Sequence, residues 1–400
     1  MSAVPRRRRS TLVAGSGIAR AACARVTTGR RTVVVVDARL APLAEGLARP
    51  VAVVPIEVGT VDAATVAALA DRLADVRAES VVAVGGGTVL DAVAVAALGP
   101  ATVAWALQRA EGAAVVPLPA PGHRPIEVVA VPTTVGTSAE TNAVAIVRTR
   151  AGARVLVGEA VRPRYAVLDA THYATLDATD VRAGCLEALL RLAGVSTADR
   201  AHPRAHAHAV AIARALLAAG HSALTPACRL RIARLSAATQ RSAALRGRAP
   251  FSPRHWYLAN EVSFVARTTK MRATASVVSR VWQRIEDGDT RWGSAEPLEA
   301  FWREATRDAR LPLAPAAGID ALIARWGLPL APRPHAEARE AMAVRAERWW
   351  GGRGTALSGL SAPDVRDVLD RARWDPNPPA EASRLRPTHT STPAGGGEHI

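Results

Sequence analysis

Short apolar runs alternate with amphipathic segments along roughly the first 170 residues. The clearest run is TVVVV at 32–36, which is β-branched and ends at Asp37, so it predicts a buried strand with an acidic residue at its carboxyl end. Further strands are predicted at 51–56, 80–84 and 126–131, and helices over 61–77 and from residue 89. This alternation predicts an α/β domain with a parallel sheet that is covered on both faces.

The pattern changes near residue 178, where Ala- and Arg-rich segments of helical periodicity replace the strands. Helices are predicted over 181–194, 207–219 and 230–245, so this half is expected to be an all-α domain. The last 26 residues are rich in Pro, Gly, Thr and Ser, which is typical of disordered tails. We therefore expect an α/β dinucleotide-binding domain over 11–177, a helical substrate domain over 178–374 and a disordered tail over 375–400.

The composition is that of a globular protein. Of the 400 residues, 49 % are hydrophobic, and no apolar run approaches the ~20 uncharged residues of a membrane-spanning helix. The three cysteines, Cys23, Cys185 and Cys228, are too widely spaced for a disulfide framework or a Cys-rich zinc site. A reducing compartment, the cytoplasm, is the expected location.

The net charge of +16 raises the question of a nucleic-acid partner. The arginines are spread through helical segments among acidic residues, and only 4 % of residues are aromatic, too few for base-stacking platforms. The run Arg6–Arg9 with the apolar stretch after it resembles a signal peptide, but Arg20 interrupts that stretch. We therefore expect neither a nucleic-acid nor a membrane partner, and the region from Thr11 fits better as part of the fold.

The sharpest local feature is the segment VGGGTVLD at 84–91. Gly85, Gly86 and Gly87 lie between a predicted strand and a predicted helix, so the backbone can turn tightly and approach a ligand closely. Free amides at the positive end of a helix dipole favour a phosphate, and Asp91 one turn later can brace the loop. Many strand–helix turns use glycine without a ligand, so the triplet alone leaves both interpretations open.

Asp37 also has two interpretations. A carboxylate at the end of an early strand can accept hydrogen bonds from a ribose 2′-hydroxyl and repel a 2′-phosphate. It can equally cap the segment ARLAPLAEGLA that follows it. The sequence leaves both roles open, and they are compatible.

Five motifs follow one another along the chain. They are G-S-G at 15–17, Asp37 after a strand, G-G-G-T-x-x-D at 85–91, V-P-T-T-x-G-T-S-A-E-T at 131–141 and V-L-D at 167–169. Together they resemble the iron-containing alcohol dehydrogenase superfamily, which includes glycerol dehydrogenases and is related to dehydroquinate synthases. The resemblance covers roughly residues 11–350. The family pattern at the fourth motif is close to P-T-T-x-G-T-G-S-E-x-T, from which Ser138 and Ala139 depart.

The resemblance implies that the chain binds NAD rather than NADP. The glycine turn would hold the pyrophosphate, the Thr-rich segment would lie beside the nicotinamide and its ribose, and Asp37 would select NAD. The implied cofactor residues are Asp37, Gly85, Gly86, Gly87, Thr88, Asp91, Thr133, Thr134 and Thr137. The segment T-S-A-E-T lacks the G-G-K-T-type sequence of dehydroquinate synthases, which favours a dehydrogenase-like branch.

The family's divalent metal is held in the helical domain by an Asp or Glu and by histidines, two of them about fourteen to sixteen positions apart. Glu187 falls at the carboxylate position, but Arg191, one turn later, replaces a histidine. His255 matches the next ligand, and counting onward reaches Lys270 and its neighbours instead of a histidine. The two remnant ligands, Glu187 and His255, beside positive charge make a poor divalent-metal site, so we expect no tightly bound metal.

Lys270 is the only lysine in the chain. A buried ammonium can stabilise a developing alkoxide, and a lysine can also act as an acid or a base. We hypothesise that Lys270, paired with Glu187 and near His255, replaces the charge of the metal. The alternative is that Lys270 is an ordinary surface residue.

These features predict an NAD-dependent oxidoreductase that transfers hydride from a secondary alcohol to nicotinamide, with Lys270, His255 and Glu187 as catalytic residues. Arg191, Arg254 and Lys270 are candidates for binding a substrate carboxylate. A β-hydroxy acid oxidised in this way becomes a β-keto acid, which readily loses carbon dioxide. A branch of the superfamily found with peptide natural products is thought to do this to a peptide's C-terminal residue.

The expected partners are therefore a small-molecule or peptide substrate and a second copy of the chain. Two other functions stay open. One is a dehydroquinate-synthase-like cyclase that uses NAD transiently, which Glu187 favours. The other is a non-catalytic descendant that binds NAD or a partner protein.

Overall fold

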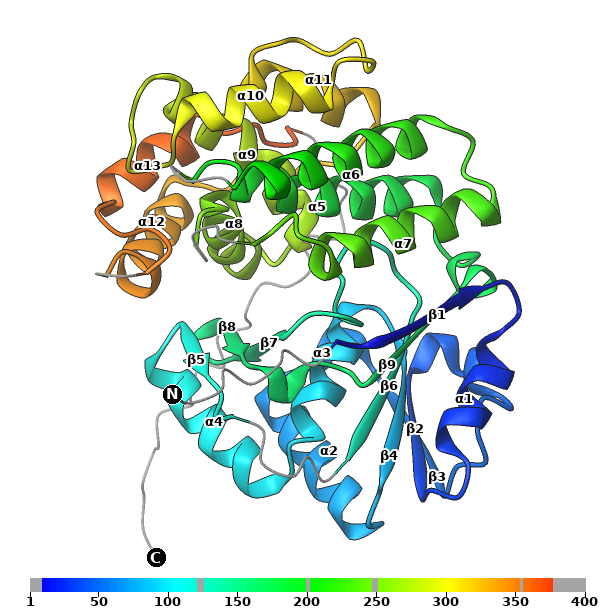
Figure 1. The fold of residues 1–400 in the computed structure, drawn as a ribbon. Coiled ribbons are helices and arrows are strands. Elements are labelled where there is room, and N and C mark those ends of the chain that lie inside the picture. The colour runs from blue at the N-terminus through cyan, green and yellow to red at the C-terminus, as the bar shows by residue number, and fades with distance from the viewer. Residues whose placement is uncertain (1–8, 121–125, 199–201, 247–250, 353–354, 377–400) are drawn as a thin grey trace, which may run out of the picture.

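A computed structural model describes residues 9–120, 126–198, 202–246, 251–352 and 355–376. An α/β part, blue to green in Figure 1, lies beside a helical part, green to orange. Residues 1–8, which include most of the arginine run, and 377–400, nearly all of the predicted tail, lie outside the described residues.

Six parallel strands form the main sheet in the order β1-β9-β6-β4-β2-β3. They are β1 (Thr11–Gly15), β2 (Thr32–Asp37), β3 (Ala52–Ile56), β4 (Ser80–Gly85), β6 (Glu127–Pro132) and β9 (Tyr165–Asp169). The predicted parallel α/β sheet is confirmed. The four strands predicted by residue range are β2, β3, β4 and β6, to within one residue at either end.

The continuous apolar runs are explained by helices on both faces of this sheet. Val33 and Val35 of β2 pack on α2 (Ala63–Asp75), α3 (Gly87–Ala96) and α4 (Pro100–Gly112), whereas Val34 and Val36 pack on α1 (Ala19–Thr27). Because successive side chains of a strand point to opposite faces, both sets must be apolar. The carboxyl ends of the strands, where the glycine turn and the Thr-rich segment begin, face the helical part (Figure 1).

A second sheet has three strands in the order β5-β8-β7. They are β5 (Val115–Pro117), β7 (Val144–Thr149) and β8 (Gly152–Val157), and β7 pairs with β8 in antiparallel fashion. The sequence analysis predicted neither these strands nor α4, because the strands are short and only one face of each is buried. Four 3₁₀ segments complete this part: η1 (Ala38–Ala44), η2 (Val58–Thr60), η3 (Glu159–Val161) and η4 (Ala170–Tyr173).

The second part of the described chain is helical, as predicted. Its helices are α5 (Ala178–Val195), α6 (Pro203–His221), α7 (Pro226–Arg241), α8 (Arg254–Val265), α9 (Lys270–Glu286), α10 (Ala295–Ala305), α11 (Pro315–Arg325), α12 (Ala336–Trp350) and α13 (Ala362–Arg371). Trp282, Trp292, Trp302 and Trp350 are fully buried among them. Helix α7 begins four residues before the predicted range, because Thr225 caps it and Pro226 is its first residue.

No single helix of the described segments is long and apolar enough to span a membrane. Helices α3 and α4 reach the required length and apolarity only as a pair, and the chain bends by 118° between them.

Candidate functional site

Two strands of the main sheet, β1 and β4, end in glycine, and the turns that follow them differ in what occupies them. At the β1–α1 turn, the Asp169 carboxylate accepts hydrogen bonds from the amides of Gly17 (2.8 Å) and Ala19 (2.7 Å). A carboxylate of the protein itself therefore occupies the free backbone amides at the start of α1. At the β4–α3 turn the N-cap is Gly86, and no described side chain caps the helix. The start of α3 is thus the one available to an external anion.

The structure brings the Thr-rich segment against this second turn. Thr133 donates its amide hydrogen to the Gly85 carbonyl at 3.0 Å. A Cβ atom on Gly86 would lie 3.1 Å from Cγ2 of Thr134, and one on Gly87 would lie 3.0 Å from Cγ2 of Thr137. Glycine at both positions therefore lets Thr134 and Thr137 pack directly against the turn, and we call the turn with these two threonines the glycine cradle.

The other predicted cofactor residues have varied surroundings. Thr88 is exposed at the start of α3. Asp37 accepts the Arg39 amide (3.1 Å) and pairs with the Arg39 guanidinium (3.3 Å), so it does cap η1, and its ribose role stays a prediction. Asp91 accepts the amide of Ile146 at 3.0 Å. It therefore ties α3 to β7, and its role at the glycine turn stays a prediction.

The residues for which the resemblance predicts metal-ligand positions come together near Asp91. Lys270, the first residue of α9, interacts electrostatically with Glu187 and Arg191 of α5 and with Asp91 of α3. Its ammonium also lies 4.6 Å from the ring centre of Trp256. Burial lowers the pKa of Lys270, whereas the charges of Glu187 and Asp91 raise it. Lys270 is therefore part of a half-buried charged cluster and not an ordinary surface residue.

His255 is the least suitable of the three predicted catalytic residues to exchange a proton. Its side chain is buried, and its Nε2 atom has no hydrogen-bond partner among the described residues. Burial, reinforced by the Lys270 charge, lowers the pKa of His255 to about 3. The imidazole is therefore neutral and a weak base at physiological pH.

The carboxyl groups of Asp91 and Glu140 lose their protons less readily than ordinary carboxyl groups. Burial raises the pKa of Asp91 to about 7, although the Ile146 amide and Lys270 oppose the shift. Burial likewise raises the pKa of Glu140 to about 7, against the attraction of Arg191. Sequence analysis did not single out Glu140, whose one signal was its place in the T-S-A-E-T motif.

The raised pKa of Asp91 predicts how stability depends on pH. Above the ordinary value of 3.8 an unfolded chain releases this proton, whereas the folded chain keeps it up to about pH 7, so rising pH destabilises the fold. As the pH rises from 5 to 8, the free energy of unfolding of the wild type should fall by about 2 kcal/mol relative to that of Asp91→Asn. Urea unfolding at each pH measures it. Parallel curves for the two proteins would contradict the prediction. The pKa of Glu140 is also raised and that of His255 is lowered, but these two residues contribute the same pH dependence of stability to both proteins.

The residues present do not fit the family's metal. Arg191, at a ligand position, is a buried cation whose guanidinium bonds to protein carbonyl and hydroxyl groups, and Lys270 adds a second positive charge. Two cations at ligand positions repel a divalent ion. In the described ranges no group of three His, Cys, Asp or Glu side chains is arranged to hold a metal. Arg191 is also unavailable for a substrate carboxylate, which corrects that expectation.

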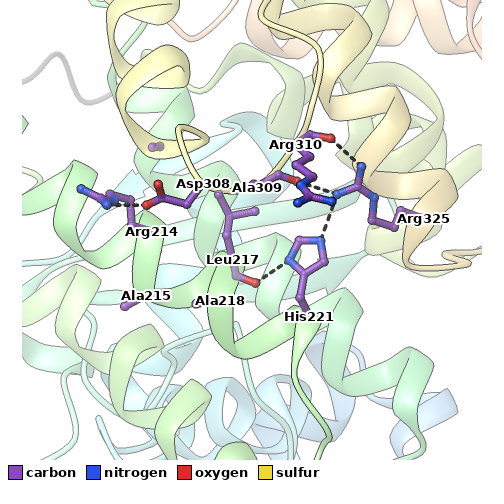
Figure 2. A pocket seen from close by; sticks show the side chains of 10 residues that line it. Arg214, Ala215, Leu217, Ala218, His221, Asp308, Ala309, Arg310 and Arg325 are labelled. Carbon is purple, nitrogen blue, oxygen red and sulfur yellow. Dashed lines mark hydrogen bonds and ion pairs between the residues drawn. The ribbon is translucent and has the colours of Figure 1, made fainter.

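A pocket of about 520 Å³ lies elsewhere, between α6, the end of α10 and α11 (Figure 2). Arg214, His221, Asp308, Arg310 and Arg325 line it together with alanines and Leu217. Figure 2 shows Arg214 paired with Asp308, and Arg325 bonded to the carbonyls of the 309–310 turn. None of the predicted site residues lines this pocket. We therefore place the candidate site at the carboxyl end of the main sheet, where the glycine turn and the charged cluster lie.

Comparisons with known proteins support the family resemblance. Residues 10–170 match the model of the iron-containing alcohol dehydrogenase family. The phosphonoacetaldehyde reductase of Streptomyces viridochromogenes is 39 % identical over 147 residues, which are 35 % of this chain and 36 % of that protein. The chain thus matches about a third of the length of this curated relative.

Solved structures extend the likeness to the whole fold. The NADH-dependent butanol dehydrogenase A of Thermotoga maritima has a TM-score of 0.74 at 14 % identity, with 92 % of this chain and 98 % of that one covered. The maleylacetate reductase of Agrobacterium tumefaciens has a TM-score of 0.67 at 16 % identity, with 93 % and 98 % covered. Residues 10–170 therefore resemble the iron-containing alcohol dehydrogenase family, and the chain as a whole shares the fold of these solved structures.

Proposed function

We propose that the protein is an NAD-dependent oxidoreductase that interconverts an alcohol and a carbonyl compound, with Lys270 in place of a divalent metal. The observation that carries the proposal is the position of Lys270: its ammonium lies over Trp256, beside Glu187 and Asp91, where the family's metal ligands would converge. The uncapped start of α3 and the glycine cradle support NAD binding. Asp37, at the end of β2, favours NAD over NADP.

The bound nicotinamide would supply the hydride chemistry. Gly86 and Gly87 would donate backbone amides to the pyrophosphate, and Thr134 and Thr137 would line the cleft beside it. The nicotinamide would take up or give the hydride of the alcohol carbon. In oxidation the neutral amine of Lys270 would accept the hydroxyl proton and become an ammonium, and in reduction the ammonium would return that proton to the carbonyl oxygen. In both directions the ammonium would stand beside the oxygen when that oxygen carries negative charge.

An anionic group on the substrate fits the basic surroundings. Lys270 is the candidate cation for it, since the Arg191 guanidinium bonds to the 136–138 loop and Arg254 bonds to the Ala356 carbonyl at 3.2 Å. The relative from Streptomyces is named for an aldehyde that carries a phosphonate. We therefore propose an alcohol or aldehyde with a neighbouring carboxylate or phosphonate, of which a β-hydroxy acid, free or at a peptide's C-terminus, is one case.

The growth of NADH absorbance tests this function. Purified protein is mixed with NAD and a panel of β-hydroxy acids, and with NADH and phosphonoacetaldehyde. NADH that accumulates with NAD, or is consumed with the aldehyde, in an amount equal to the product formed supports the oxidoreductase. Product formation without net NADH would favour the dehydroquinate-synthase-like cyclase. Calorimetric NAD binding without turnover of any substrate would favour the non-catalytic descendant.

The rate of alcohol oxidation should rise with pH through the pKa of Lys270, because only the neutral amine accepts a proton. Burial places that pKa below its ordinary value of 10.5. Since Lys270 is the only lysine, reductive methylation with ¹³C-formaldehyde labels one side chain besides the N-terminus, and its NMR titration reports this pKa directly. The same pKa should appear in the rate profile. A resonance that titrates at or above 10.5 would contradict the assignment.

A further inference from the structure

Arg191 lies on α5 with only 4 % of its surface exposed, and its guanidinium spans two parts of the fold. It donates to the carbonyls of Gly136 (2.6 Å) and Thr137 (3.0 Å) and to the hydroxyl of Ser138 (3.0 Å), all in the segment 136–138. It also donates to the hydroxyl of Thr239 on α7 at 2.9 Å. One side chain thus joins α5, α7 and the loop that faces the glycine turn.

We propose that Arg191, which stands where the family resemblance predicts a metal ligand, is a positioning residue that anchors the loop 136–138. It holds this segment to the helical part and so sets where Thr137 lies against Gly87. The two cations would then have separate roles, Lys270 facing the substrate and Arg191 fixing the loop. The consequence for NAD rests on the function proposed above, whereas the consequence for the loop does not.

The backbone of this segment needs such support. Gly136 has a φ of +106° and Ser138 a φ of +57°, and the second is a left-handed conformation that a residue with a side chain rarely adopts. The loop also packs directly on α5, since a Cβ atom on Gly184 would lie only 2.2 Å from the Val135 carbonyl oxygen. Backbone in such conformations persists only when its surroundings fix it. The three bonds from Arg191 to residues 136–138 provide part of that constraint, and the bond from the Ser138 hydroxyl to the Ser236 carbonyl (2.9 Å) adds to it.

The charge of Arg191 is compensated inside the protein. Burial lowers its pKa, and the charges of Glu187 and Glu140 raise it. The guanidinium also lies 5.5 Å from the ring centre of Trp256. A planar guanidinium can bond to four acceptors in fixed directions, whereas a lysine ammonium has three donors on one atom and cannot span the same distance. Lysine is therefore a poor substitute here.

Thr137 transmits the effect to the cofactor cleft. Its Cγ2 atom lies 3.0 Å from where a Cβ atom on Gly87 would stand, so it forms a wall of the cradle at the start of α3. If the segment 136–138 loses its anchor, Thr137 no longer has a fixed place against the turn. NAD must then order the loop when it binds, which weakens binding.

Hydrogen–deuterium exchange of the loop amides in the Arg191→Lys protein tests the proposal without a cofactor. The matched control is Arg154→Lys, because Arg154 is also fully buried and bonds to three backbone carbonyls, those of Ala110, Ala151 and Ala153. We expect exchange in peptides covering residues 133–142 to rise at least about tenfold in Arg191→Lys and to stay unchanged in Arg154→Lys. Unchanged loop exchange in folded Arg191→Lys would overturn the proposal.

NAD affinity measured by calorimetry gives the second readout. The Kd for NAD should rise about tenfold or more in Arg191→Lys and stay within twofold in Arg154→Lys, even where both variants lose similar stability. If Arg191→Lys does not fold, Thr239→Val, which removes one acceptor outside the loop, replaces it with a smaller effect of the same kind. A wild type that binds no NAD while the loop exchange responds as expected would refute the proposed function and leave the anchoring role intact. An unchanged Kd with a loosened loop would refute the link to the cofactor.

Discussion

Replacing Lys270 with methionine should lower the rate of NADH formation roughly 10³-fold and leave NAD affinity within about twofold of the wild type. Methionine keeps an apolar stem of similar length against Trp256, so the packing changes little. What is lost is the positive charge beside the reacting oxygen and the group that exchanges its proton. Steady-state kinetics with saturating NAD measure the effect.

Two controls make this prediction sharp. Lys270→Arg keeps the charge but has no neutral form at accessible pH, so it should lose the rise of oxidation rate with pH and remain slower than the wild type. A thermal melt shows whether each variant is folded. Turnover by folded Lys270→Met within about tenfold of the wild type would show that the ammonium does not participate in the reaction.

Replacing Gly86 with valine should weaken NAD binding by about 100-fold. The backbone at Gly86 has a φ of −74° and a ψ of −177°, which valine can adopt. Its Cβ atom would stand 3.1 Å from Thr134, and the side chain would fill the space where the pyrophosphate meets the first amides of α3. Calorimetry with NAD measures the loss, which reflects two or three charge-assisted hydrogen bonds.

The matched control is Gly112→Ala at the end of α4. A Cβ atom there would meet nothing within 4 Å, so a glycine is changed without touching the cleft. NAD affinity of that variant should equal that of the wild type. Unaltered NAD binding by Gly86→Val would mean that the nucleotide lies elsewhere, and the β1–α1 turn, already filled by Asp169, could not provide the alternative without rearrangement.

The main sheet was predictable because its strands are buried on both faces. Runs such as TVVVV and SVVAV admit few other structures, and β2 and β4 match them closely. The hairpin of β7 and β8 was missed, since its strands bury alternate residues only and carry Arg148 and Arg154. The glycine turn and the Thr-rich segment were recognised from their motifs, and the structure brings them into contact.

Lys270 was expected beside Glu187 and His255, but the other partners of the charged residues could not be predicted. The sequence showed that Arg191 and Lys270 replace histidines, but Arg191 is bonded to a loop about 54 residues away along the chain, and Lys270 faces Asp91, which is further still. Such contacts depend on how α3, α5 and α9 pack, and no local pattern encodes that packing. For the same reason the bond between Asp91 and the Ile146 amide could not be predicted.

The dependence of turnover on metal tests the central claim most directly. Protein treated with a strong chelator and freed of it is assayed for NADH formation, and its iron and zinc content is measured by elemental analysis. The account predicts full turnover with less than about one metal ion per ten chains, because the Lys270 ammonium supplies the positive charge beside the reacting oxygen. Activity that disappears on chelation and returns with stoichiometric iron or zinc would contradict it.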